Sequence, residues 1–231
     1  MKALGIIVAR GGSKELLRKN VLKIGNETLI ERAINSALKS KKLNKVILST
    51  EDYEILKIAK KTNIEIPFKR PLKLAKDSSS VYDVMRHAIN YLQKKQDYIP
   101  DIVVLLQCSS PFRTSLHIDK VINKLIKTRA DAVITITKPD YPAYWMLKQD
   151  KNNKLKKLIE NKNFYRRQLA PSIYQPAGSV YAFQKNFLMR MKGMLPQGDT
   201  RGVIIKREEA INIDTPLQFE LAKIIYKNFK K

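Results

Sequence analysis

The sequence predicts an α/β fold, in which a Rossmann-like, mostly parallel sheet carries helices on both faces, and 231 residues suit a single domain spanning 1–231. Two observations lead to this prediction. Continuous apolar runs of strand length, KALGIIVA at 2–9 and DIVVLLQ at 101–107, are typical of strands buried on both faces. Segments with an apolar stripe at helical spacing alternate with such runs, as βαβ units do.

The first half of the chain shows this alternation most clearly. A helix is expected after Thr28, whose side-chain oxygen can accept a hydrogen bond from a free N–H of the first turn. Apolar residues spaced by three and four predict two further helices, over 81–92 and 118–126. The other predicted elements in this part are strands at 45–50, 64–68 and 131–137 and a helix at 52–62.

The alternation then breaks. Residues 140–175 are polar and aromatic and contain the turn sequence DKNNK. We therefore predict that a β-rich arm, a hairpin, is inserted at this point. GSVYAF at 178–183 returns to a strand. The last helix is expected to begin at DTP, 214–216, with the aspartate or threonine as its cap and the proline in its first turn.

The composition is strongly basic. Lysine and arginine number 45 against 21 aspartate and glutamate, which gives a formal charge of +24. Such a field attracts nucleic acid or a small polyanionic substrate, but lysines spread over nearly every segment are more typical of a solvated surface, so nucleic acid is the less favoured partner. The one cysteine, Cys108, and an N-terminal apolar run too short for a membrane span lead us to expect a cytoplasmic protein without membrane contact.

The first predicted strand leads into VARGGSKELLRKN at 8–20, and we call residues 10–20 the first loop. Ligands bind beyond the carboxyl ends of the strands in an open parallel sheet, and the two glycines allow backbone N–H groups to approach an anion. Four cations of this loop could neutralise a triphosphate, namely Arg10, Lys14, Arg18 and Lys19. The loop matches neither the dinucleotide fingerprint nor the P-loop, and a glycine turn with solvated lysines is the alternative interpretation.

A second polar stretch, LLQCSSPFRT at 105–114, follows the other strongly apolar strand. Together the two stretches resemble the acylneuraminate cytidylyltransferase family, whose members make CMP-activated sialic acids and related nonulosonic acids. The family sequences read roughly A-R-G-G-S-K-G-x-x-x-K-N and L-L-Q-P-T-S-P-x-R-T. Three more matching stretches, at 68–84, 166–168 and 211–219, follow in the family's order, so the resemblance covers almost the whole chain.

The resemblance implies an enzyme, a nucleotidyltransferase that condenses CTP with an acidic nonulosonic sugar of sialic, legionaminic or pseudaminic type and releases pyrophosphate. The nucleotide-binding residues it implies are Arg10, Gly11, Gly12, Ser13, Lys14, Asn20, Arg70 and Ser80. The implied sugar-binding residues are Gln107 and Arg167, and the implied catalytic residues are Lys14, Lys19, Gln107 and Asp214. A homodimer is also implied, because the family's arm reaches a partner subunit, and Tyr144 and Trp145 would lie either at that interface or under the sugar.

The chain departs from the family pattern at several positions. The family's Asp-x-Asp, which holds Mg²⁺, reads Asn212-Ile213-Asp214 here, and on a strand the first and third side chains share one face. Asn212 and Asp214 are therefore the expected Mg²⁺ ligands, with weakened metal binding. Glu15 replaces a glycine beside the expected phosphates, where it must turn outward or pair with Arg18, and Ala177 replaces an asparagine near the sugar.

Two alternatives stay open from the sequence alone. A 3-deoxy-manno-octulosonate cytidylyltransferase would use the same chemistry on an eight-carbon acid. A member that has lost catalysis would instead bind a polyanion such as RNA. No general base is evident, because His87 and His117 both fall within predicted helices, and Cys108, where the family often has proline, is expected to be a small buried residue.

Overall fold

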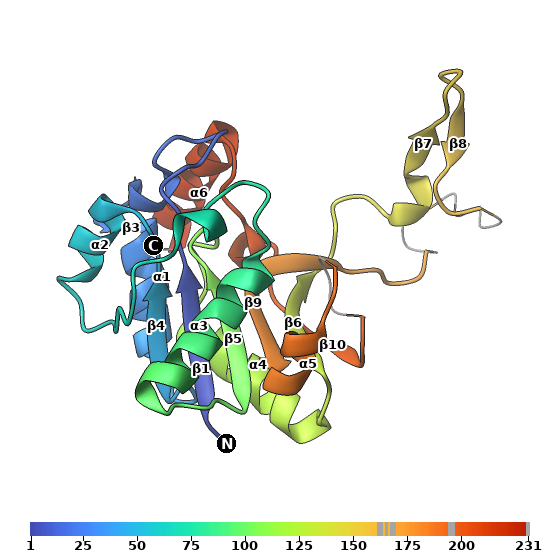
Figure 1. Ribbon diagram of the computed structural model, residues 1–231. Helices are drawn as coiled ribbons and strands as arrows, with labels where there is room; N and C mark the ends of the chain where they lie inside the picture. The colour runs from blue at the N-terminus through green and yellow to red at the C-terminus, as the bar shows by residue number, and fades with distance from the viewer. Residues whose placement is uncertain (161–163, 165, 167–169, 194–196, 230–231) are drawn as a thin grey trace.

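A computed structural model describes residues 1–160, 164, 166, 170–193 and 197–229 (Figure 1). Its centre is a six-stranded sheet in the order β10-β6-β9-β5-β1-β4. The strands are β1 (Ala3–Val8), β4 (Lys45–Ser49), β5 (Ile102–Gln107), β6 (Ala132–Thr137), β9 (Gln175–Gln184) and β10 (Thr200–Ile204). β1 pairs in parallel with β4 and β5, and β10 with β6, whereas β9 runs antiparallel between β5 and β6. The predicted mostly parallel sheet is confirmed.

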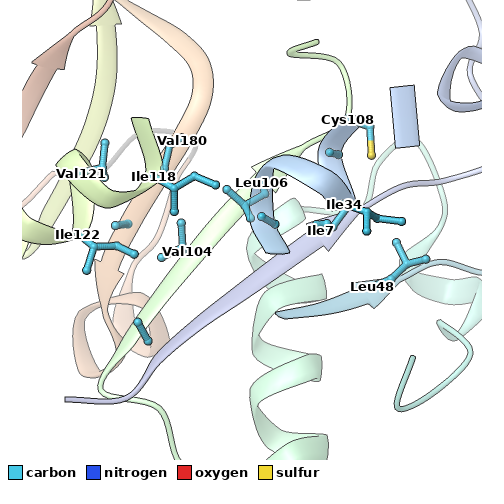
Figure 2. Close-up of a cluster of buried hydrophobic side chains, with 14 of the residues drawn as sticks. Ile7, Ile34, Leu48, Val104, Leu106, Cys108, Ile118, Val121, Ile122 and Val180 are labelled. Atoms are coloured by element: carbon cyan, nitrogen blue, oxygen red, sulfur yellow. The ribbon is translucent and has the colours of Figure 1, made fainter. Parts of the chain in front are cut away.

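Helices cover both faces of this sheet, as the sequence predicts (Figure 1). Successive strand residues point to opposite faces, so Ile7 of β1 joins the core beneath α1 and α4, while Ile6 joins the core beneath α3. Figure 2 shows the first of these cores, where Ile34 and Ile118 approach the sheet from the two helices. The helices are α1 (Leu29–Leu38), α2 (Tyr53–Ala59), α3 (Val81–Gln96), α4 (Ser115–Thr128), α5 (Lys185–Arg190) and α6 (Pro216–Phe229).

Helix starts agree with the capping residues in the sequence. Thr28 caps α1 by accepting a hydrogen bond from the Glu31 backbone N–H, and the Glu31 side chain accepts one from the Thr28 N–H in return. The Thr215 hydroxyl accepts a hydrogen bond from the Gln218 N–H at the start of α6. These local contacts fix where the helices begin, which is why the sequence predicts them well.

Six elements differ from the prediction. The expected strand at 64–68 is wrong, because this segment contributes only one isolated bridge, between Ile47 and Glu65. The expected helix at 52–62 ends earlier, at Ala59. The sequence analysis also missed β10 and α5, together with a short hairpin of β2 (Lys23–Ile24) and β3 (Glu27–Thr28).

The chain leaves the sheet after β6 and returns at β9. Between them, β7 (Leu147–Gln149) and β8 (Leu155–Lys157) form an antiparallel hairpin that projects away from the sheet (Figure 1). The predicted hairpin within 140–175 is confirmed. None of the helices in the described part of the chain combines the length and the apolar character that a membrane crossing requires.

Candidate active site

A cavity of about 560 Å³ lies beyond the carboxyl ends of β1 and β5, where Val8 and Gln107 end the two strands. This is the position that the topology of an open parallel sheet favours for a ligand. The predicted residues that line it are Arg10, Ser13, Lys14, Lys19, Asn20, Arg70, Gln107 and Asp214. The predicted residues Gly11, Gly12, Ser80 and Asn212 are not among the lining residues, and Arg167 lies outside the described residues.

The first loop is held in shape by contacts with the segment that follows β4. The Gly11 N–H donates to Glu51 Oε1 over 2.8 Å, and the Asn20 side-chain amide donates to the Arg10 carbonyl over 2.9 Å. A Cβ at Gly11 would lie 2.2 Å from Asp52 Oδ2, so the close approach of these two segments requires glycine there. The Gly11 N–H therefore stabilises the conformation of the first loop.

Arg18 does not line the cavity, in contrast to the other three cations of the first loop. Its guanidinium donates to Asp52 Oδ2 over 2.5 Å and also pairs with Glu54, and the hydrogen bond from Arg18 lowers the pKa of Asp52. The expectation that Arg18 helps neutralise a triphosphate is wrong for this arrangement. Arg18 pairs with these two carboxylates instead of Glu15, which is itself a lining residue.

Asp77 is a lining residue that the sequence analysis missed. Its carboxylate lies 2.7 Å from Lys14 Nζ and also pairs with Arg10. The hydrogen bond from Lys14, followed by that from Arg10, lowers the pKa of Asp77. Glu51 does not line the cavity, but it accepts a hydrogen bond from the Gly11 N–H and lies 3.7 Å from Arg70 Nη1, and it was not predicted either. The sequence carries a signal for Asp77 alone, because Asp77 lies between Arg70 and Ser80 in a stretch assigned to the nucleotide.

Arg70 forms part of the cavity wall and is only 5 % exposed. Its Nε donates to Ser49 Oγ over 3.1 Å, its guanidinium also reaches the Ser49 carbonyl, and Nη1 lies 3.7 Å from Glu51 Oε2. Burial lowers the pKa of Arg70. The nearby Ser80 caps α3, accepting a hydrogen bond from the Tyr82 N–H.

Arg113 ties the loop after β5, residues 108–114, to the ends of β5 and β9. It is buried and donates to the carbonyls of Gln107, over 2.6 Å, and Ser179, over 3.1 Å. Burial lowers the pKa of Arg113 to about 10. The neighbouring Cys108 is buried as expected, and burial raises the pKa of its thiol to about 12, so it is neutral. Arg113 thereby fixes where Gln107 meets the cavity.

Asp214 lies at the cavity, where its Oδ1 is 2.7 Å from Lys19 Nζ. The expected strand at 212–214 is wrong, because these residues form no strand, and Asn212 has partners of its own. Asn212 Oδ1 accepts a hydrogen bond from Ser110 Oγ over 2.5 Å, and its Nδ2 donates to the Ala177 carbonyl over 3.0 Å. Within the described part of the chain, no group of three or more His, Cys, Asp or Glu residues could hold a metal ion.

Both histidines are ordinary helix residues, as predicted. His117 lies in the first turn of α4, where its Nδ1 accepts a hydrogen bond from the Thr114 N–H and its Nε2 is 3.6 Å from Glu209 Oε2. His87 lies on α3 against the Phe68 ring, with the ring centres 4.7 Å apart. Neither is among the residues that line the cavity.

A family model described as cytidylyltransferase matches residues 4–228 of this chain. The chain belongs to the cytidylyltransferase family. A pseudaminic acid cytidylyltransferase of Campylobacter jejuni is 31 % identical, with 98 % of this chain and 97 % of that protein covered. A CMP-N,N'-diacetyllegionaminic acid synthase of the same species is also 31 % identical, over 95 % of this chain and 92 % of that protein.

The fold of this cytidylyltransferase also matches a solved structure of a CMP:2-keto-3-deoxy-manno-octonic acid synthetase complexed with CTP. The TM-score is 0.73 at 15 % identity, and the match covers 99 % of this chain and 100 % of that one. The likeness confirms the predicted fold, and the family confirms the predicted nucleotidyltransferase. In this cytidylyltransferase, cations from the first loop, Arg70 and Gln107 surround a single cavity.

Proposed function

We propose that this cytidylyltransferase condenses CTP with an acidic nonulosonic sugar, of sialic, legionaminic or pseudaminic type. The anomeric hydroxyl attacks the α-phosphorus of CTP, the bond from that phosphorus to the bridging oxygen breaks, and the CMP-sugar and pyrophosphate leave, with the hydroxyl proton released. The names of the two Campylobacter relatives support this choice of sugar over the eight-carbon acid.

The observation that carries the proposal is the convergence of Arg10, Lys14 and Lys19 on one cavity at the carboxyl ends of β1 and β5. Phosphoryl transfer needs alignment and stabilisation of developing charge more than covalent catalysis. These three cations can meet the phosphates, and Arg70 and Ser80 belong to the part of the chain assigned to cytidine. Gln107, at the end of β5, would then orient the sugar acid.

Asp214 is the residue that we assign to Mg²⁺. Its carboxylate is 59 % exposed and borders the cavity, so it is available to a cation. One carboxylate fits Mg²⁺, which commonly keeps several waters and takes its other ligands from the substrate phosphates. When bound, Mg²⁺ supplies positive charge to the phosphate under attack. Lys19 holds the Asp214 carboxylate at the cavity edge.

Two further parts of the proposal concern the sugar and the subunit. Arg167 is assigned to the sugar carboxylate, since a guanidinium can grip a carboxylate with two parallel hydrogen bonds. The arm is assigned to a homodimer interface, supported by its exposed apolar side chains Trp145, Leu147 and Leu155. The free, buried Cys108 suits a reducing compartment, and we assign the protein to the cytoplasm.

The experiment is an assay of pyrophosphate released from CTP and Mg²⁺ with a panel of acidic sugars. We expect turnover with at least one nine-carbon acid and little with 3-deoxy-manno-octulosonate. Turnover with the eight-carbon acid alone would replace the substrate assignment. Absence of pyrophosphate with every acid, together with salt-dependent RNA binding, would favour a non-catalytic polyanion-binding role.

A further inference from the structure

Asn212 joins three segments that are distant in the sequence. Its Oδ1 accepts a hydrogen bond from Ser110 in the loop after β5, and its Nδ2 donates to the Ala177 carbonyl in β9. The adjacent Gly178 has φ +70°, and a Cβ there would lie 2.4 Å from Asn212 Nδ2. The backbone at Gly178 therefore makes room for this amide.

The same contacts fix the residue that follows. The Ile213 N–H donates to the Ser109 carbonyl over 2.8 Å, and the Ile213 side chain is fully buried in a third core with Ile24 and Leu29. With Asn212 tied on one side and Ile213 buried on the other, the next residue, Asp214, is directed to the cavity beside Lys19. The segment has no strand pairing that could do this instead.

The two hydrogen bonds require an amide. Asn212 must accept from a hydroxyl and donate to a carbonyl at the same time, and an ionised carboxylate has no donor. An aspartate at this position would place a carboxylate oxygen about where Nδ2 now lies, 3.0 Å from the Ala177 carbonyl oxygen. Two acceptor oxygens that face each other repel. The half-buried carboxylate oxygen would also lose hydrogen bonds to water without gaining a donor in the protein.

We infer that Asn212 is a positioning residue, whose amide ties the loop after β5 to β9 and thereby places Asp214, and that it is not a Mg²⁺ ligand. The inference rests on the proposed role of Asp214 in binding the metal. It reverses the expectation from the sequence, where restoring an Asp-x-Asp pair would strengthen metal binding. Both functional atoms of the Asn212 side chain are already used within the protein.

The test compares Asn212→Asp and Ser110→Ala with the wild type, and with Asn186→Asp as a matched control at an exposed position on α5. Mn²⁺ binding in the presence of CTP is measured by electron paramagnetic resonance, and the melting temperature is measured without metal or nucleotide. We expect Asn212→Asp and Ser110→Ala to weaken Mn²⁺ binding about tenfold or more, as loss of a group that orients a ligand does. The melting temperature of Asn212→Asp should fall below that of Asn186→Asp.

Tighter Mn²⁺ binding by Asn212→Asp, or an unchanged melting temperature, would overturn the inference. Either result is expected if residue 212 is a metal ligand and its amide is not needed for the fold. If Asn212→Asp does not fold, Ser110→Ala decides, and unchanged Mn²⁺ binding by that variant rejects the positioning role. The proposed function is checked separately: if wild type with CTP binds no more Mn²⁺ than CTP alone, the metal assignment of Asp214 fails. The melting temperatures then still decide whether the Asn212 amide is required.

Discussion

Two cations of the first loop, Arg10 and Lys14, share one carboxylate, that of Asp77. The pairs lie at the surface of the cavity, where ion pairs add little stability. A triphosphate arriving at the same cations brings about four negative charges at neutral pH and meets the Asp77 charge as well. Repulsion of the substrate therefore outweighs any help that Asp77 gives in holding the cations.

The Asp77→Asn variant tests this balance, since it keeps the shape of the side chain and removes the charge. We expect a severalfold lower KM for CTP and little change in kcat, because the change acts on binding of the ground state and the transition state alike. Initial rates against CTP concentration, at low and at high salt, provide the measurement. A raised KM would mean that Asp77 chiefly orients Arg10 and Lys14.

Lys14 projects from the first loop and is largely exposed, so its loss should not disturb the fold. In the proposed reaction Lys14 meets the negative charge that develops during attack on the α-phosphorus, and removal of one such stabilising contact typically costs about 10²–10³ in rate. We expect Lys14→Ala to lose about that much kcat with an unchanged melting temperature. Lys73→Ala, an exposed lysine outside the cavity, is the control. Activity within threefold of wild type would contradict the catalytic role of Lys14 and would favour the interpretation of the first loop as a glycine turn with solvated lysines.

The sequence reveals which residues border the cavity better than it reveals which partners they have. Arg10, Lys14 and Lys19 could be placed there because the loop follows a buried strand directly. The partners of Arg18 could not be predicted. Asp52 and Glu54 follow β4, and they lie close to Arg18 because β4 pairs with β1 in the sheet. Hydrogen-bond partners distant in sequence depend on strand order, which the local pattern does not contain.

At the scale of elements, predictability follows burial. β1 and β5 are buried along nearly their whole length, and their apolar runs are visible in the sequence. β10, TRGVI, is mostly half-buried or exposed at the sheet edge, and no periodic pattern marks it. The antiparallel direction of β9 was not predicted either, because it depends on where the arm returns the chain to the sheet.

The β7–β8 hairpin is too small to be stable alone, and a two-stranded hairpin in water needs a further surface to pack on. Leu147 and Leu155 pair across this hairpin with Lys157 and Gln149, and both leucines are exposed. If the arm forms the dimer interface, Leu155→Asp should convert the dimer to a monomer in size-exclusion chromatography with light scattering.

The control for the arm is Ile99→Asp, which adds the same charge at an exposed apolar residue of the main body. This variant should keep the wild-type mass. A wild-type protein that is already monomeric, or a Leu155→Asp variant with the wild-type mass, would contradict the assignment of the arm to a subunit interface.

At the scale of the whole molecule, the charge of +24 acts on any anion that approaches the cavity. Lysines far from the cavity contribute to this field only where salt does not screen them. Lys94 and Lys95 lie in the last turn of α3, whose first residue, Val81, lines the cavity. A helix rises about 1.5 Å per residue, so these lysines are on the order of 20 Å from the site.

Ionic strength therefore separates the long-range field from the local cations. The Debye length is about 30 Å at 0.01 M and about 8 Å at 0.15 M, so Lys94 and Lys95 should act at the site only at low salt. We expect the double variant Lys94→Glu/Lys95→Glu to lower kcat/KM for CTP at 0.01 M and to match wild type at 0.15 M. It should leave kcat unchanged at both salt concentrations, because steering affects encounter alone.

Lys14→Ala should stay defective at both salt concentrations, since its contact with the phosphates is direct. Steady-state rates over this salt range provide the measurement. A double variant that equals wild type at 0.01 M would show that Lys94 and Lys95 do not steer CTP and that the cations lining the cavity account for its attraction.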